Sequence, residues 1–138
     1  MVDRMELKKN LLSGRNCAQC VFGAFADRLD YAEEELYRIA AGFGGGMERG
    51  DTCGAVTGAL MAIGAAFGED KEVVREKTVQ FQEAFCARFG TTLCRELLGY
   101  DFSKPDELAA AKERGVMAER CPDYVIAAAE IAERLLNE

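Results

Sequence analysis

The sequence contains no histidine, and it contains only two prolines. Without histidine, a site lacks the usual general base, the usual partner of a nucleophilic cysteine and the commonest nitrogen ligand of a metal. No haem is expected, because there is neither a CxxCH attachment motif nor a histidine for axial ligation. A functional site must therefore be built from sulfur, carboxylate, hydroxyl or backbone groups.

Positive charge and long apolar runs are also scarce. The 17 basic residues are outnumbered by 24 acidic ones, and the net charge of −7 disfavours the phosphate neutralisation on which nucleic-acid binding depends. The longest apolar run, from Ala55 to Phe67, is shorter than the roughly 20 residues that a membrane-spanning helix needs. The first residues show no export signal. We therefore expect a cytoplasmic protein that binds neither nucleic acid nor a membrane.

Strand-like alternation of apolar and polar residues is absent, and apolar residues recur at helical spacing instead. The segment from Cys53 to Phe67 carries glycine and alanine at four-residue spacing, so another helix can approach it closely. The sequence predicts an all-α fold, a compact single domain over residues 1–138 with about five to seven helices around this central Gly/Ala-rich helix.

Three other helices are predicted from apolar stripes and their flanking residues. One begins near Asn16 and continues to Leu29, and a long amphipathic one runs from about Glu69 to Phe89. The last is expected to open at Cys121-Pro122, because proline favours the first turn of a helix.

Four of the six cysteines fall in the first turns of predicted helices: Cys17, Cys53, Cys94 and Cys121. A helix N-terminus presents unpaired N–H groups and a partial positive charge, which stabilise a thiolate over a thiol. Because no export signal is seen, these thiols are expected to meet a reducing environment, where cysteines are more often catalytic, sensing or metal-binding than disulfide-bonded. The four cysteines are the candidate catalytic residues.

The alternative for any one cysteine is an inert side chain in a helical core. Cys20 and Cys86 lie in the middle of apolar stripes and are predicted to be core residues. Cys17 and Cys20 form a CxxC at a helix start, without the preceding strand of a thioredoxin-like site. No second close cysteine pair provides zinc-finger spacing, so a metal site would have to be assembled by the tertiary fold.

Four segments carry a resemblance to a known family. The sequence resembles the redox-active protein family named for its C_GCAxxG_C_C cysteine pattern, and the similarity spans almost the whole chain. The resemblance implies a small all-helical protein with four signature cysteines and a redox role. The segments are Asn16-Cys17-Ala18-Gln19, Cys53-Gly54-Ala55-Val56-Thr57-Gly58-Ala59, Cys94 before Leu97-Leu98-Gly99-Tyr100-Asp101, and Cys121 before Val125 and Ala127-Ala128-Ala129-Glu130.

Three hypotheses follow. In the first, the thiols carry out thiol–disulfide or electron-transfer chemistry, with Cys17 or Cys53 attacking and another signature cysteine resolving the mixed disulfide, as in a thiol-dependent oxidoreductase. In the second, Cys17, Cys53, Cys94 and Cys121 ligate a metal, either zinc or an iron–sulfur cluster. In the third, the chain is a non-catalytic helical interaction module. The expected partner is a redox partner protein or a small thiol, and a homodimer is compatible with a spare apolar helix face.

Overall fold

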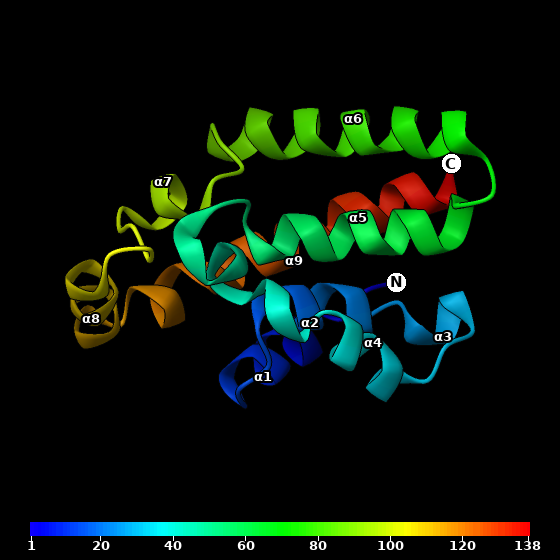
Figure 1. Cartoon of the computed structure of the whole chain (residues 1–138). Coiled ribbons are helices and arrows are strands. Elements are labelled where there is room, and N and C mark those ends of the chain that lie inside the picture. The colour runs from blue at the N-terminus through cyan, green and yellow to red at the C-terminus, as the bar shows by residue number, and fades with distance from the viewer.

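The structure, a computed structural model, describes all residues from 1 to 138. It is 78% helical without strands, so the predicted all-α fold is confirmed. The predicted five to seven helices were too few, because turns divide several expected segments (Figure 1). The elements are α1 (Arg4–Leu12), α2 (Cys17–Gly23), α3 (Ala26–Leu29), α4 (Glu33–Ile39), the short turns η1 (Ala41–Phe43) and η2 (Gly46–Gly50), α5 (Gly54–Phe67), α6 (Lys71–Phe89), α7 (Cys94–Leu98), α8 (Pro105–Arg114) and α9 (Val116–Asn137).

One helix prediction is divided in the structure, and another is confirmed. The expected helix over residues 16–29 is split into α2 and α3, and Gly23 at the end of α2 lies against the ring of Tyr37. A larger side chain at Gly23 could not be accommodated there. The long helix predicted up to Phe89 is α6, and the left-handed Gly90 ends it.

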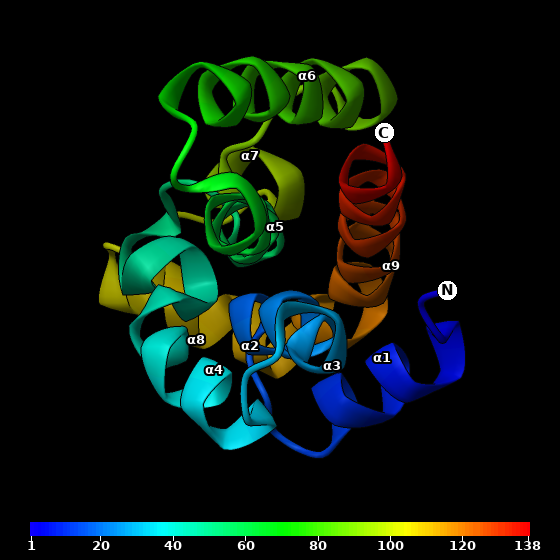
Figure 2. The same cartoon turned by 90° about the vertical axis from the view of Figure 1, so that its right-hand side faces the viewer.

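The Gly/Ala-rich helix α5 lies at the centre of the molecule, as predicted. Viewed along its axis in Figure 2, it is surrounded by α2, α6 and α9, and all three pack against it. Its residues Ala55, Val56, Ala59 and Ile63 are completely buried. Because small side chains dominate this helix, its neighbours approach its backbone closely.

Two glycines of α5 make the approach of α2 possible. A Cβ atom on Gly58 would lie 2.6 Å from the carbonyl oxygen of Ala18, and one on Gly54 would lie 3.2 Å from the Cβ atom of Cys17. Neither position has room for a methyl group. The two helices therefore meet backbone to backbone, and this contact brings Cys17 to the beginning of α5.

We expect Gly58→Ala to lower the free energy of unfolding by about 1–3 kcal/mol, because the added methyl group would force α2 away from α5. Gly64→Ala is the matched control on the same helix, since no atom lies within 4 Å of the added methyl. It should instead stabilise the protein by about 0.5–1 kcal/mol through helix propensity. Urea unfolding followed by circular dichroism measures both, and equal effects would contradict the close-approach account.

A second, smaller apolar cluster lies beside the main core. It joins α7, α8 and the first turns of α9, and α8 projects at the left end of the molecule in Figure 1. The main core contains Cys53, whereas the smaller cluster contains Cys94 and Cys121. Cys17 packs against both clusters, so it lies where they meet.

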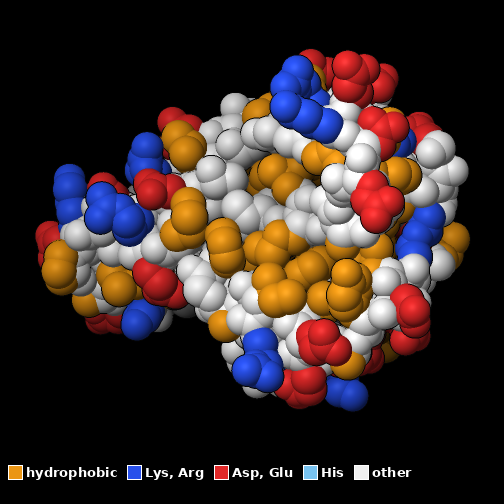
Figure 3. All heavy atoms as spheres, turned by 45° about the vertical axis from the view of Figure 1, so that its right-hand side comes forward, with side chains coloured by type: hydrophobic (Ala, Val, Ile, Leu, Met, Phe, Trp, Pro, Cys, Tyr) orange, Lys and Arg blue, Asp and Glu red, His pale blue; other side chains and the backbone are white.

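On the face shown in Figure 3, lysine and arginine side chains alternate with acidic ones around a central apolar area. This face carries no continuous basic patch of the kind that tracks a phosphate backbone. None of the helices has the length and apolar character required to span a membrane.

Candidate active site

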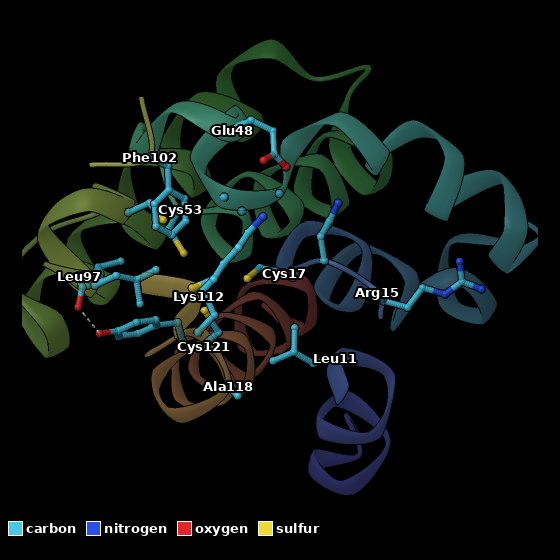
Figure 4. A pocket seen from close by; sticks show the side chains of 18 of the residues that line it. Leu11, Arg15, Cys17, Glu48, Cys53, Leu97, Phe102, Lys112, Ala118 and Cys121 are labelled. Atoms are coloured by element: carbon cyan, nitrogen blue, oxygen red, sulfur yellow. Dashed lines mark hydrogen bonds between the residues drawn. The ribbon is translucent and has the colours of Figure 1, made fainter. Parts of the chain in front are cut away.

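All four signature cysteines line one pocket. The pocket has a volume of about 400 Å³, within the range of small-molecule sites, and its walls are mainly apolar. Figure 4 shows Cys17, Cys53 and Cys121 around it, and Cys94 lines it as well. The fold thus brings together the cysteines that the sequence singled out, at the junction of the two apolar clusters.

Cys17 is positioned by a capping box at the start of α2. The Asn16 side chain accepts a hydrogen bond from the Gln19 N–H at 2.8 Å, and the Gln19 side chain accepts one from the Asn16 N–H at 2.9 Å. The Asn16 amide also donates to the carbonyl of Ala41 at 3.1 Å. Cys17 is therefore the first residue of α2, as predicted, and it is the only half-buried member of the four.

Cys53 and Cys94 are held side by side by a short antiparallel bridge between Thr52 and Leu93. The Cys53 N–H donates to the Thr92 carbonyl, and the Cys94 N–H donates to the Asp51 carbonyl, both at 2.7 Å. Since side chains alternate along extended backbone, Cys53 and Cys94 point to the same side of the bridge. The structure thereby places the starts of α5 and α7 beside each other. The spacing of these residues in the sequence did not predict this arrangement.

Cys121 does not lie at a helix start, so the prediction for the last helix was wrong. Helix α9 begins at Val116, directly after the left-handed Gly115, and continues through Pro122. Pro122 is buried, and its packing offsets the cost of about 3 kcal/mol that proline imposes inside a helix. The Tyr124 hydroxyl donates to the Leu97 carbonyl at 2.9 Å, which ties this part of α9 to α7.

The Cys17, Cys53 and Cys94 thiols have raised pKa values and are held in the protonated form, contrary to the expectation from helix starts. The Cys121 thiol is the hydrogen-bond partner that, together with burial, raises the pKa of Cys17 well above its ordinary value of 9.0. Burial raises the pKa of Cys53 to about 12, with a further contribution from Cys17. Burial also raises the pKa of Cys94 to about 12, and the nearby Cys53 adds to this effect.

The predicted effect of the helix N-terminus exists but is outweighed. Backbone N–H groups of Ala55 and Val56, in the first turn of α5, lower the pKa of Cys53. Desolvation of the buried sulfur and the proximity of Cys17 act in the opposite direction and dominate. The sequence showed where the N–H groups would be, but it did not show how deeply the sulfur would be buried.

The metal-ligand hypothesis receives no geometric support from the arrangement of side chains. No three side chains among cysteine, aspartate and glutamate are grouped closely enough to hold a metal ion. Cys20 lies in the main core, 1% exposed, as predicted, whereas Cys86 is only half-buried on α6. Neither lines the pocket.

Two charged residues that the sequence did not single out reach the pocket from opposite sides. Lys112 comes from α8, and Glu48 comes from η2 (Figure 4). Glu48 is the last of four consecutive residues with left-handed backbone. The angle φ is +60° at Gly45, +62° at Gly46, +58° at Met47 and +60° at Glu48. Such a conformation is rare for residues other than glycine, and strain of this kind is found preferentially at functional sites.

We expect Met47→Gly to stabilise the protein by up to about 1 kcal/mol, because it removes the steric cost of a left-handed methionine. Met47 is 40% exposed, so little packing is lost. The matched control is Met5→Gly, at an exposed methionine inside the right-handed helix α1, and it should destabilise. Thermal unfolding checks both variants. A destabilised Met47→Gly protein would mean that its side chain, rather than the backbone, holds the turn.

The raised pKa values predict slow modification of the native thiols at neutral pH. With a pKa near 12 in place of 9.0, the thiolate fraction of Cys53 and Cys94 falls about a thousandfold. Alkylation by iodoacetamide, followed by peptide mass spectrometry between pH 7 and pH 11, should give rates that still rise at the alkaline end. In the unfolded protein, the alkylation rates of the same peptides should level off above about pH 10, one unit above the ordinary pKa of 9.0. A plateau below pH 8 in the native protein would contradict this result.

Comparison with known proteins agrees with the resemblance seen in the sequence. Residues 15–135 match the family described as "Putative redox-active protein (C_GCAxxG_C_C)". Because the match spans most of the chain, the chain belongs to this redox-active protein family. No curated protein and no solved structure matches it.

Proposed function

We propose that the protein carries out reversible thiol–disulfide chemistry in this pocket, with Cys17 and Cys121 as the working pair. The observation that supports it most strongly is the convergence of these two cysteines in one pocket from opposite ends of the chain, near enough for Cys121 to raise the pKa of Cys17. Membership in a redox-active family supports the general role. Cys17 is assigned the first attack because it is the only one of the four that is half-buried as a whole residue, and it lies where the two apolar clusters meet.

The exchange proceeds in two balanced steps. The ionised sulfur of Cys17 attacks a substrate disulfide, so one sulfur–sulfur bond breaks and another forms, and the departing thiolate takes up a proton. Cys121 then gives up its proton and attacks the Cys17 sulfur, which releases the second half of the substrate as a thiol. The substrate is reduced to two thiols, and the protein is left with a Cys17–Cys121 disulfide.

Cys53 and Cys94 form a second pair next to the first. Both are close enough to Cys17 for its charge to affect their pKa values. In our proposal, Cys53 attacks the Cys17–Cys121 disulfide at Cys17, and Cys94 resolves the resulting bond. The oxidised state then passes to the inner pair, and the outer pair becomes free for another substrate disulfide.

Zinc or an iron–sulfur cluster bound by Cys17, Cys53, Cys94 and Cys121 is the alternative use of the same sulfurs. It is the weaker proposal, because these thiols are not grouped as a metal site. Binding a metal would require the walls of the pocket to move inward. Stoichiometric zinc or iron in protein purified without oxygen would favour this alternative.

We expect mild oxidation of the reduced protein with diamide to produce a Cys17–Cys121 disulfide and a mass decrease of about 2 Da. Peptide mapping under non-reducing conditions identifies the linkage. Cys17→Ser and Cys121→Ser should abolish this linkage, whereas Cys86→Ser, outside the pocket, serves as the matched control and should retain it. If native Cys17 stays reduced while another cysteine is oxidised first, the assignment of the working pair is wrong.

A further inference from the structure

The burial of the cysteines favours small molecules over protein substrates. The attacking Cys17 is half-buried, and the three thiols that act after it, Cys53, Cys94 and Cys121, are only 4%, 6% and 7% exposed, so a convex protein surface does not reach them. A molecule that fits into about 400 Å³ can reach them. The apolar walls suit the carbon and sulfur atoms of such a molecule, and its charged groups must remain near the mouth.

The mouth of the pocket offers one charge of each sign. The Glu48 carboxylate is close enough to the thiols to contribute to the raised pKa of Cys94. Lys112 extends across the opening from the other wall (Figure 4). Neither side chain takes part in any of the six ion pairs of the molecule, and both residues are solvent-exposed.

The other cation near the pocket is already engaged. The Arg15 guanidinium stacks on the ring of Tyr37, 3.8 Å from its centroid, and pairs with Glu34 at 3.8 Å. Figure 4 shows it pointing away from the sulfurs. Lys112 and Glu48 are therefore the two charged groups that remain free to bind a ligand.

The geometry points to a substrate of defined class: a low-molecular-weight disulfide whose ends carry both an amino group and a carboxylate, as in an amino acid. Lys112 would bind the carboxylate, Glu48 would bind the ammonium group, and the disulfide would lie against Cys17 among the apolar side chains. The inference rests on the thiol–disulfide function proposed above. It assigns Lys112 and Glu48, which that function does not use, as specificity residues.

The chemical step is the exchange described above with the substrate specified. The Cys17 sulfur forms a bond to one sulfur of the substrate, and the amino-acid thiol leaves and takes a proton. Attack by Cys121 releases the second amino-acid thiol. One disulfide is reduced and one is formed, so no further oxidant or reductant takes part.

Three symmetrical disulfides that differ in their charged groups test this assignment, and each rate is divided by the rate of the same disulfide with a free model thiol, because the leaving thiols differ in pKa. Cystine carries both groups, cystamine lacks the carboxylates, and dithiodipropionate lacks the amino groups. Formation of the mixed disulfide at Cys17 is followed by mass spectrometry on the reduced full-length protein, after Cys121→Ser has removed the resolving thiol. We expect cystine to react faster than either of the others by about fivefold, the upper range for one solvent-exposed ion pair.

Each variant should lower a different ratio of rates. Lys112→Gln should lower the rate with cystine relative to cystamine, and Glu48→Gln should lower the rate with cystine relative to dithiodipropionate. Glu113→Gln is the matched control, because Glu113 adjoins Lys112 on α8, is exposed and does not line the pocket. It should change neither ratio.

The outcomes separate this inference from the proposed function. Equal rates with all three disulfides, or ratios that Lys112→Gln and Glu48→Gln leave unchanged, overturn the substrate assignment while exchange at Cys17 stands. If no disulfide reacts with native Cys17, the proposed function fails. Calorimetric titration of the Cys17→Ser variant with cystine then decides the binding site alone. Binding that Lys112→Gln weakens supports the site, and absence of heat, or binding that Lys112→Gln leaves unchanged, rejects it.

Discussion

The close approach of α2 to α5 is the contact on which the rest of the structure depends. Gly54 and Gly58 leave no side chain between the two helices, so the backbone of Ala18 lies directly on α5. A wider separation would remove Cys17 from the start of α5 and open the main core to solvent. The glycines that weaken α5 as an isolated helix therefore make the cysteine pocket possible.

The pocket lies at the junction of two apolar clusters, and this location determines the chemistry of its sulfurs. Helix N-termini favour thiolates, as the N–H groups near Cys53 illustrate, but burial and neighbouring sulfurs have the larger effect. The resting thiols of Cys17, Cys53 and Cys94 are consequently protonated and slow to react with reagents from solution. In the function we propose, a bound substrate supplies the proximity that the low thiolate fraction does not.

Much of the fold was predictable from the sequence, because helical spacing and glycine placement are local signals. The central helix and the long helix up to Phe89 both follow from such signals. The start of the last helix was not predictable in the same way, because Pro122 is tolerated inside α9 by packing that involves other parts of the chain. Local propensity favoured a start at Cys121, and tertiary burial outweighed it.

The candidate site was predictable in its residues but not in its electrostatics. The family pattern identified the four cysteines that line the pocket. It did not identify the bridge between Thr52 and Leu93, which pairs residues far apart in the sequence. Nor did it identify Glu48 or Lys112, since charged residues in a loop or on an amphipathic helix are ordinarily solvated and carry no sequence signal.

A crystal structure of the reduced protein, grown without oxygen, tests the central claim most directly. We predict that Cys17, Cys53, Cys94 and Cys121 will surround one pocket, with the sulfurs of Cys17 and Cys121 in contact. Cysteines separated into different apolar regions, with other side chains between Cys17 and Cys121, would contradict the account.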